Sequence, residues 1–133
     1  MEHTGGCLCG AIRYRVIGPP TATSLCHCDS CRRSTGGPSL AWAIFDQDKV
    51  EIISGELAIH RSSPGVERGF CAACGTSLTY ARENRPGLFH VTTASLDDPE
   101  AFPPAVEIWV EEKLWWITTH PALPHFDRSS TPG

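Results

Sequence analysis

The stretch Cys26-His27-Cys28-Asp29-Ser30-Cys31 places three cysteines within six residues, in the spacing C-x-C-x-x-C. We call these three residues the cysteine triplet. The β-branched and polar run 21–25 precedes the triplet as a predicted strand, and the basic and then glycine-rich run 32–38 follows it as a predicted loop. The triplet is therefore predicted to lie at a strand end, where binding and catalytic groups concentrate.

The four remaining cysteines form two pairs. Cys7 and Cys9 make a C-x-C pair with glycines on both sides, and Cys71-Ala72-Ala73-Cys74-Gly75 is a C-x-x-C pair with the spacing of a zinc knuckle. Structural zinc sites have four protein ligands, whereas catalytic zinc usually has three and keeps one position for water or substrate. The pairs thus predict one closed structural site and the triplet one open site, with two zinc ions per chain.

Spacing alone leaves another assignment of the triplet open, since a distant histidine could complete it into a closed structural site. His27 is the least suitable, because in an extended C-x-C its side chain points away from those of its two neighbours. The other candidates are His60, His90, His120 and His125.

The charge of an open three-cysteine site favours one kind of chemistry. Three thiolates on Zn²⁺ leave a net charge of about −1, so the ion activates water less than one held by neutral histidines. A zinc ion rich in thiolates instead accepts an incoming thiol and holds it as a thiolate, ready to attack a carbonyl carbon. The triplet therefore predicts a thiol substrate rather than simple hydrolysis.

Length and composition bound the class of protein. The chain has 133 residues, of which 41% are hydrophobic and 20% charged, as is usual for a globular protein. These values predict a single zinc-binding domain over residues 1–128 and a frayed tail over 129–133. The formal net charge of −4 argues against nucleic acid as a partner.

The chain start and the cysteine count predict a cytoplasmic protein without a membrane segment. Residues 1–6 contain no basic and apolar signal-peptide pattern, and no run approaches transmembrane length. Reducing conditions in the cytosol keep thiols free, so seven cysteines are expected to hold metal rather than to form disulfides.

Alternating hydrophobicity and turn residues predict a mainly β protein of short, mostly antiparallel strands without a long helix. The runs 49–53 and 55–61 are expected to follow one another in a meander, and 105–110 and 114–118 to form a hairpin around 111–113. One helical turn is expected within 95–100, and Asp29 is expected to cap a short turn at Cys31. The other predicted strands are 11–17, 21–25, 39–45, 66–70, 76–80 and 88–93.

The cysteine motifs and their order resemble those of the glutathione-dependent formaldehyde-activating enzymes and their relatives, which include centromere protein V. The resemblance covers nearly the whole chain. It rests on Gly5-Gly6-Cys7-Leu8-Cys9-Gly10, on Cys26-His27-Cys28-Asp29-Ser30-Cys31-Arg32-Arg33 with Gly36, and on Phe70-Cys71-Ala72-Ala73-Cys74-Gly75-Thr76, with softer matches at Ser95-Leu96-Asp97-Asp98 and from Ile108-Trp109 to Trp115-Trp116.

This resemblance implies a β-tent fold, built from several small twisted antiparallel sheets with zinc-knuckle turns. It also implies a structural zinc on Cys7, Cys9, Cys71 and Cys74, and a catalytic zinc on Cys26, Cys28 and Cys31. The family's named activity joins glutathione and formaldehyde into S-hydroxymethylglutathione and is classed as a carbon–sulfur lyase activity.

Four further residues are candidates for binding the substrate. Arg32 and Arg33 follow the triplet directly, and a guanidinium group suits a carboxylate, although both could equally offset thiolate charge or lie in solvent. Gly36 could let the backbone approach a ligand, although glycines more often make turns. Because adjacent tryptophans cannot both face one core, Trp115 or Trp116 is expected to be exposed or to line a groove.

Three functions are compatible with these patterns. The leading hypothesis is a zinc-dependent carbon–sulfur lyase that adds glutathione or a similar small thiol to a small aldehyde such as formaldehyde. A rival is a non-catalytic, zinc-stabilised binding module with both zinc ions structural, which a fourth protein ligand at the triplet would favour. A thiol–disulfide redox protein using Cys71 and Cys74 is less well supported, since no thioredoxin-like βαβ pattern surrounds them.

Overall fold

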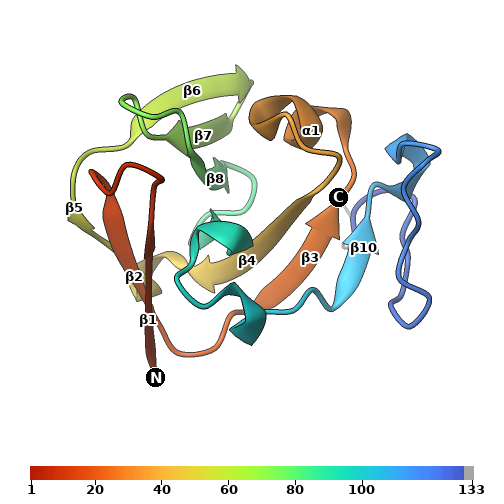
Figure 1. Cartoon of the computed structure of the whole chain (residues 1–133), viewed down its shortest axis with the longest axis horizontal. Helices are drawn as coiled ribbons and strands as arrows, with labels where there is room; N and C mark the ends of the chain where they lie inside the picture. The colour runs from red at the N-terminus through yellow and green to blue at the C-terminus, as the bar shows by residue number, and fades with distance from the viewer. Residues whose placement is uncertain (131–133) are drawn as a thin grey trace.

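The computed structural model describes residues 1–130 of the chain, and over these residues ten strands form two sheets (Figure 1). One α-helix and four short 3₁₀ helices connect them. The strands are β1 (Glu2–Gly6), β2 (Arg13–Ile17), β3 (Ala22–Cys26), β4 (Leu40–Asp46), β5 (Val50–Ser54), β6 (Ala58–Ser63), β7 (Val66–Phe70), β8 (Ser77–Arg82), β9 (Leu88–Thr92) and β10 (Val106–Ile108). The helices are α1 (Asp29–Thr35), η1 (Gln47–Lys49), η2 (Thr93–Ser95), η3 (Pro99–Ala101) and η4 (Val110–Glu112).

The smaller sheet is antiparallel and has the order β1-β2-β5. On β2, Tyr14 and Val16 are buried on one face, whereas Arg15 on the other face lies 2.5 Å from Glu51 of β5. This alternation is the one predicted for a half-buried strand. The buried face packs into the main core together with Phe45 of the larger sheet.

The larger sheet has the order β10-β3-β4-β9-β8-β7-β6, and all its pairs are antiparallel except β10 with β3. The central strand β4 serves both faces of this sheet, because successive side chains of a strand point in opposite directions. Ala43 and Phe45 belong to the main core, whereas Leu40 and Trp42 pack in a second cluster with the cysteine triplet. The strand therefore separates the core from the triplet.

The prediction of a mainly β, β-tent protein without a long helix is confirmed, with the strands gathered into two sheets. The predicted meander of 49–53 with 55–61 is wrong, since β5 pairs with β2 in the smaller sheet and β6 lies at the edge of the larger one. The sequence reading also missed β1, which pairs with β2. Strand pairing depends on which strand faces can be buried together, and the alternation of polar and apolar residues within one strand does not show which strand is its partner.

The predicted loop after the triplet is wrong in its first part, because residues 29–35 form α1. The N-cap is Cys28 rather than Asp29, and the backbone N–H of Cys31 donates to the Cys28 sulfur at 3.3 Å. Gly36 ends the helix in the left-handed conformation at φ 72°, which glycine adopts without steric cost. Local capping thus permits a short helix in a segment rich in loop-forming residues.

The predicted hairpin of 105–110 with 114–118 is also wrong. Only β10 is a strand, it runs parallel to β3, and the chain then turns into η4 after Trp109 at φ 56°. The segment near Phe126 takes the place of a hairpin partner, since its N–H donates to the Glu107 carbonyl at 2.9 Å and its carbonyl accepts from Val110 at 3.1 Å. A segment distant in sequence therefore satisfies this backbone.

Two shorter predictions concern the remaining segments. In place of the single helical turn expected within 95–100, η2 and η3 overlap the two ends of that range. The predicted tail at 129–133 lies partly outside the described residues, which end at Ser130. Within residues 1–130, no helix combines the length and the apolar character that a membrane crossing needs.

Candidate metal centres and substrate cavity

The cysteine triplet is assembled by the end of β3 and the start of α1. Cys26 is the last residue of β3, Cys28 caps the helix and Cys31 lies in its first turn. The three sulfur atoms lie within 4.8 Å of one another, and Cys26 and Cys31 are buried. A strand end followed at once by a helix turn therefore brings all three to one point.

The other four cysteines form a second cluster between the two sheets. Cys7 and Cys9 follow β1 of the smaller sheet, and Cys71 and Cys74 follow β7 of the larger one. Their four sulfur atoms also lie within 4.8 Å of one another, with 3.6 Å from Cys7 to Cys9 and 3.8 Å from Cys9 to Cys71. The predicted division of the seven cysteines into four and three is the division that the fold brings about.

The donor chemistry of both clusters fits zinc. A tetrahedral ion with Zn–S bonds of about 2.3 Å has sulfur-to-sulfur edges of about 3.8 Å, close to the distances in the four-cysteine cluster. In the triplet, the neighbouring Cys28 and Cys31 sulfurs, together with burial, raise the pKa of Cys26. All three thiols can ionise together only if a cation balances their charge, and zinc is a cation that sulfur donors prefer.

None of the histidines considered as a fourth ligand joins the triplet within residues 1–130. His27 is fully buried and points at Glu107, with 2.6 Å between His27 Nε2 and Glu107 Oε1. The backbone N–H of His120 donates to the other oxygen of Glu107 at 2.6 Å. Among the side chains of residues 1–130, no histidine, carboxylate or further cysteine joins the three sulfurs.

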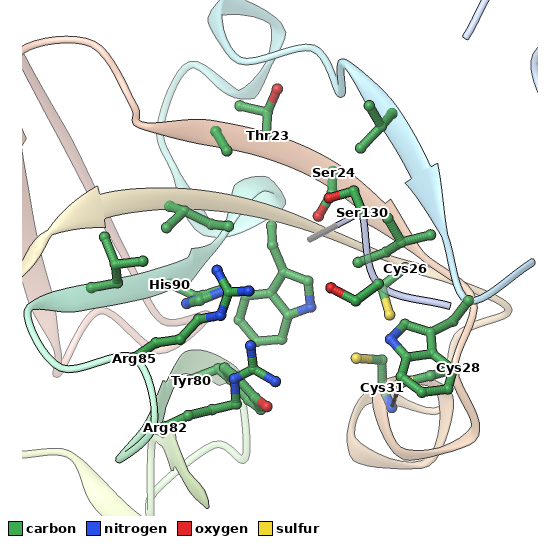
Figure 2. Close-up of a pocket in the computed structure, with 18 of the residues that line it drawn as sticks. Thr23, Ser24, Cys26, Cys28, Cys31, Tyr80, Arg82, Arg85, His90 and Ser130 are labelled. Carbon is green, nitrogen blue, oxygen red and sulfur yellow. Dashed lines mark hydrogen bonds between the residues drawn. The ribbon is translucent and has the colours of Figure 1, made fainter. Parts of the chain in front are cut away.

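A cavity of about 380 Å³ opens beside the triplet, on the face of the larger sheet opposite the main core (Figure 2). Figure 2 shows Cys26, Cys28 and Cys31 at one side of this space and Arg82, Arg85 and His90 at the other. Its apolar wall is formed by Trp42, Ile44, Leu88, Val106, Ile108 and Trp109, and its polar lining includes Arg68, Tyr80, Arg82, Arg85 and His90.

The strand register explains how the floor of this cavity arises. Arg68 of β7 lies opposite Tyr80 of β8, Tyr80 opposite His90 of β9, and His90 opposite Ile44 of β4. Residues in such a cross-strand row share one face of the sheet. Four strands thus place one residue each in a continuous row beside the triplet.

Arg68 connects this row to the triplet. Its Nη1 atom lies 4.0 Å from the Cys31 sulfur, and its guanidinium carbon lies 4.9 Å from the centroid of the Tyr80 ring. The guanidinium charge therefore stabilises negative charge on sulfur at the triplet, while the aromatic ring holds the arginine in place.

His90 is held in its uncharged form by its surroundings. Burial, and then the positive charges of Arg82 and Arg85, lower its pKa from 6.5 to about 4. The folded protein therefore binds fewer protons at this site than the unfolded chain between these two pKa values, and stability falls as pH decreases through that window.

The variant His90→Asn tests this pKa. We expect the difference in unfolding free energy between wild type and His90→Asn to fall by about 1.4 kcal/mol per pH unit from pH 6 to pH 5, measured by urea denaturation. Parallel pH dependences of the two proteins would contradict the assignment.

The residues predicted to bind substrate have other surroundings. Arg32 donates to the carbonyls of His27 and Glu112, both at 3.3 Å, and Arg33 is 81% exposed and pairs with Asp29. Gly36 caps α1, and Trp115 is 90% exposed. None of these four lines the cavity within the described part of the chain. A substrate role for them stays a prediction without support from the cavity.

Sequence reasoning missed the arginines that do line the cavity. Arg68 and Arg82 alternate with other residues on strands, a pattern that equally suits a solvent-facing side, and Arg85 lies in a polar loop. The nearest signal was the strand run Tyr80-Ala81-Arg82, in which an aromatic residue and an arginine share a face. Only the pairing of β8 with β9 shows that this face meets the triplet.

Comparison with known proteins places this fold and these motifs in a family. The family model of the glutathione-dependent formaldehyde-activating enzyme matches residues 2–112. A Halomonas elongata protein named "putative glutathione-dependent formaldehyde-activating enzyme" is 31% identical over 127 residues, which cover 88% of this chain and 80% of that protein. A Schizosaccharomyces pombe protein named as an uncharacterized lyase is 35% identical over 83 residues, covering 62% of this chain and 60% of that protein.

The fold has a counterpart among solved structures. A crystal structure of a Rhodobacter sphaeroides protein superposes with a TM-score of 0.59 at 18% identity, covering 92% of this chain and 98% of the other. This likeness concerns the fold alone. The family match over most of the chain, with both cysteine clusters assembled, shows that the chain belongs to the glutathione-dependent formaldehyde-activating enzyme family.

Proposed function

We propose that this protein is a zinc-dependent carbon–sulfur lyase that adds a small thiol, glutathione or a similar one, to a small aldehyde such as formaldehyde. One observation carries the proposal: three cysteine sulfurs within 4.8 Å of one another line a cavity of about 380 Å³, while the other four cysteines gather in a cluster of their own. The family, and the names given to the Halomonas elongata and Schizosaccharomyces pombe relatives, point to the same reaction class.

In this proposal the two cysteine clusters have different roles. Cys7, Cys9, Cys71 and Cys74 would hold a structural zinc, and Cys26, Cys28 and Cys31 would hold a catalytic one. A zinc ion bound to the triplet would supply Lewis acidity that favours the thiolate form of a substrate thiol. Free thiols in all seven cysteines suit a reducing compartment such as the cytoplasm, where we place the protein.

The surrounding residues would bind and orient the reactants. Arg68, 4.0 Å from the Cys31 sulfur, would stabilise negative charge where the substrate sulfur enters. The walls formed by Trp42 and Tyr80 would exclude water, which strengthens that attraction. The reaction forms a bond between the thiol sulfur and the aldehyde carbon and an O–H bond at the former carbonyl oxygen, while the S–H bond and the π bond of the carbonyl break. Atoms and electrons therefore balance without an oxidant or a reductant.

The rival function, a binding module with two structural zinc ions, has less support. It would be favoured by a fourth protein donor at the triplet, and no histidine, carboxylate or cysteine side chain within residues 1–130 joins the three sulfurs. The triplet also borders a cavity, which a purely structural knuckle does not require.

Cys28→Ser tests the catalytic role of the triplet. We expect the variant to fold and to lose roughly 100-fold or more of the rate at which glutathione and formaldehyde combine, because one of the three sulfur donors is removed. Exchange NMR measures this rate against the spontaneous reaction, and circular dichroism and metal analysis report on folding and zinc content.

The matched control is Ser30→Ala, an exposed residue in the same helix turn that offers no sulfur. This variant should retain the wild-type rate. Wild-type protein that does not accelerate the reaction would remove the named activity, and a Cys28→Ser variant with full activity would remove the role of the triplet.

A further inference from the structure

The far side of the cavity carries positive charge that the triplet does not use. Arg82 and Arg85 both line the cavity, and no aspartate or glutamate is present among its described lining residues. Arg68 lies beside Cys31, whereas Arg82 and Arg85 lie at the far side of the cavity from the sulfurs. A cavity lined by three guanidinium groups and, among its described residues, by no carboxylate favours an anion.

Two buried polar atoms in the same region have no hydrogen-bond partner among residues 1–130. The Nε atom of Arg82 and the Nδ1 atom of His90 are both buried, and no group within residues 1–130 forms a hydrogen bond with either. Both residues line the cavity. Buried polar groups are nearly always hydrogen-bonded, so a bound water or polar ligand beside them would account for these two atoms. The lowered pKa of His90, to about 4, agrees with its closeness to the two arginines.

The remaining lining combines a large apolar and aromatic wall with the hydroxyl residues Thr21, Thr23, Ser24, Ser129 and Ser130. Trp42, Tyr80 and His90 form mutual ring contacts, with centroid distances of 5.1 to 5.9 Å, and aliphatic side chains of β4, β9 and β10 complete the wall. The apolar part of this surface gains free energy by covering the apolar body of a bound molecule. A cavity of about 380 Å³ holds a molecule of modest size.

We propose that this cavity selects a small substrate with an apolar body and one carboxylate, held by Arg82 and Arg85 with its reacting end at the cysteine triplet. The inference rests on the proposed function in taking the bound molecule to be a substrate. The binding of its carboxylate depends only on the cavity. Either the thiol or the aldehyde could carry this carboxylate, and the chemistry of recognition is the same for both.

Binding of unreactive probes tests the cavity without catalysis. The zinc-loaded protein is titrated with hexanoate and phenylacetate and with their neutral amides, followed by calorimetry and by tryptophan fluorescence. We expect each acid to bind roughly 10- to 100-fold more tightly than its amide, the effect of a charge-assisted hydrogen bond. Acids that bind no better than their amides, or that do not bind, would overturn the proposal.

Two variants locate the carboxylate. Arg82→Gln should lower the affinity for the acids by about 10-fold or more and leave that for the amides unchanged, and Arg85→Gln should act in the same direction. Arg61→Gln is the matched control, since Arg61 lies on β6, pairs with Glu67 and does not line the cavity. Acid affinity unchanged in both cavity variants would overturn the assignment even if one of them folded poorly.

Kinetics then identify the reactant that carries the carboxylate. With formaldehyde, 6-mercaptohexanoate is compared with 6-mercaptohexanol; with the neutral thiol, 6-oxohexanoate is compared with hexanal. A lower KM for the carboxylated member of either pair, lost in Arg82→Gln, assigns it. If the acids bind as expected but no thiol and aldehyde pair reacts, the proposed function fails while the carboxylate site stands.

Discussion

We expect Cys71→Ser to abolish cooperative unfolding or to lower the unfolding temperature by roughly 20 °C or more. Cys71 is 2% exposed and belongs to the cluster of four sulfurs that connects the end of β1 with the end of β7, one strand from each sheet. A structural zinc contributes about 10–16 kcal/mol of apparent binding free energy, which is comparable to the whole stability of a small protein. Removing one sulfur therefore uncouples the two sheets.

Thermal unfolding by circular dichroism and zinc content by mass spectrometry measure this effect. The zinc content should fall from about two to about one per chain, since the triplet keeps its donors. Ala72→Ser is the matched control, because it changes an exposed residue of the same turn and leaves all four sulfurs. A Cys71→Ser protein that unfolds like wild type with its zinc intact would show that this cluster does not hold the sheets together.

Glu107→Ala is expected to have the second largest effect, a loss of about 3–5 kcal/mol in the free energy of unfolding. Glu107 is 1% exposed on the edge strand β10, and its two oxygens meet His27 and the backbone N–H of His120, each at 2.6 Å. Alanine leaves the buried His27 ring without its hydrogen-bond partner, at a cost of about 1–3 kcal/mol, and removes the acceptor of the His120 N–H. It also leaves an unfilled space where the side chain was.

Glu107→Ala should also weaken zinc binding at the triplet, since His27 lies between two of the triplet's cysteines. The backbone N–H of His27 donates to the Ile108 carbonyl of β10 at 3.0 Å. Urea denaturation measures the stability, and a chelator competition measures the zinc affinity. Glu107→Gln, which keeps the shape and part of the hydrogen bonding, should lose less. The control Glu111→Ala removes an exposed ion pair with Arg128 and should lower the free energy of unfolding by less than about 1 kcal/mol. An equal loss of stability in both alanine variants would refute the role of the buried network.

The two cysteine clusters were predictable, because the spacing that brings their sulfurs together is local. The spacing of Cys26, Cys28 and Cys31 alone requires that the three sulfurs lie near one another, whatever the rest of the chain does. The C-x-C and C-x-x-C pairs are local as well, and ligand counting unites them. For the same reason, the alternation of Tyr14 and Val16 with arginines was enough to predict β2 and its buried face.

The substrate cavity was not predictable, because its information is spread over strands far apart in sequence. The arginines next to the triplet in sequence do not line the cavity, because Arg32 donates to the carbonyls of His27 and Glu112 and Arg33 pairs with Asp29 at the surface. Arg68, Tyr80 and His90 come together only through the pairing of β7, β8 and β9.

The sequence by itself determined which sulfur atoms gather into two clusters that could hold metal ions, because the spacing of ligands acts over a few residues. Only the tertiary structure decided what faces the cysteine triplet. A one-residue change of register in β8 would turn Tyr80 and Arg82 away from the cavity, and the register depends on which faces the two sheets bury.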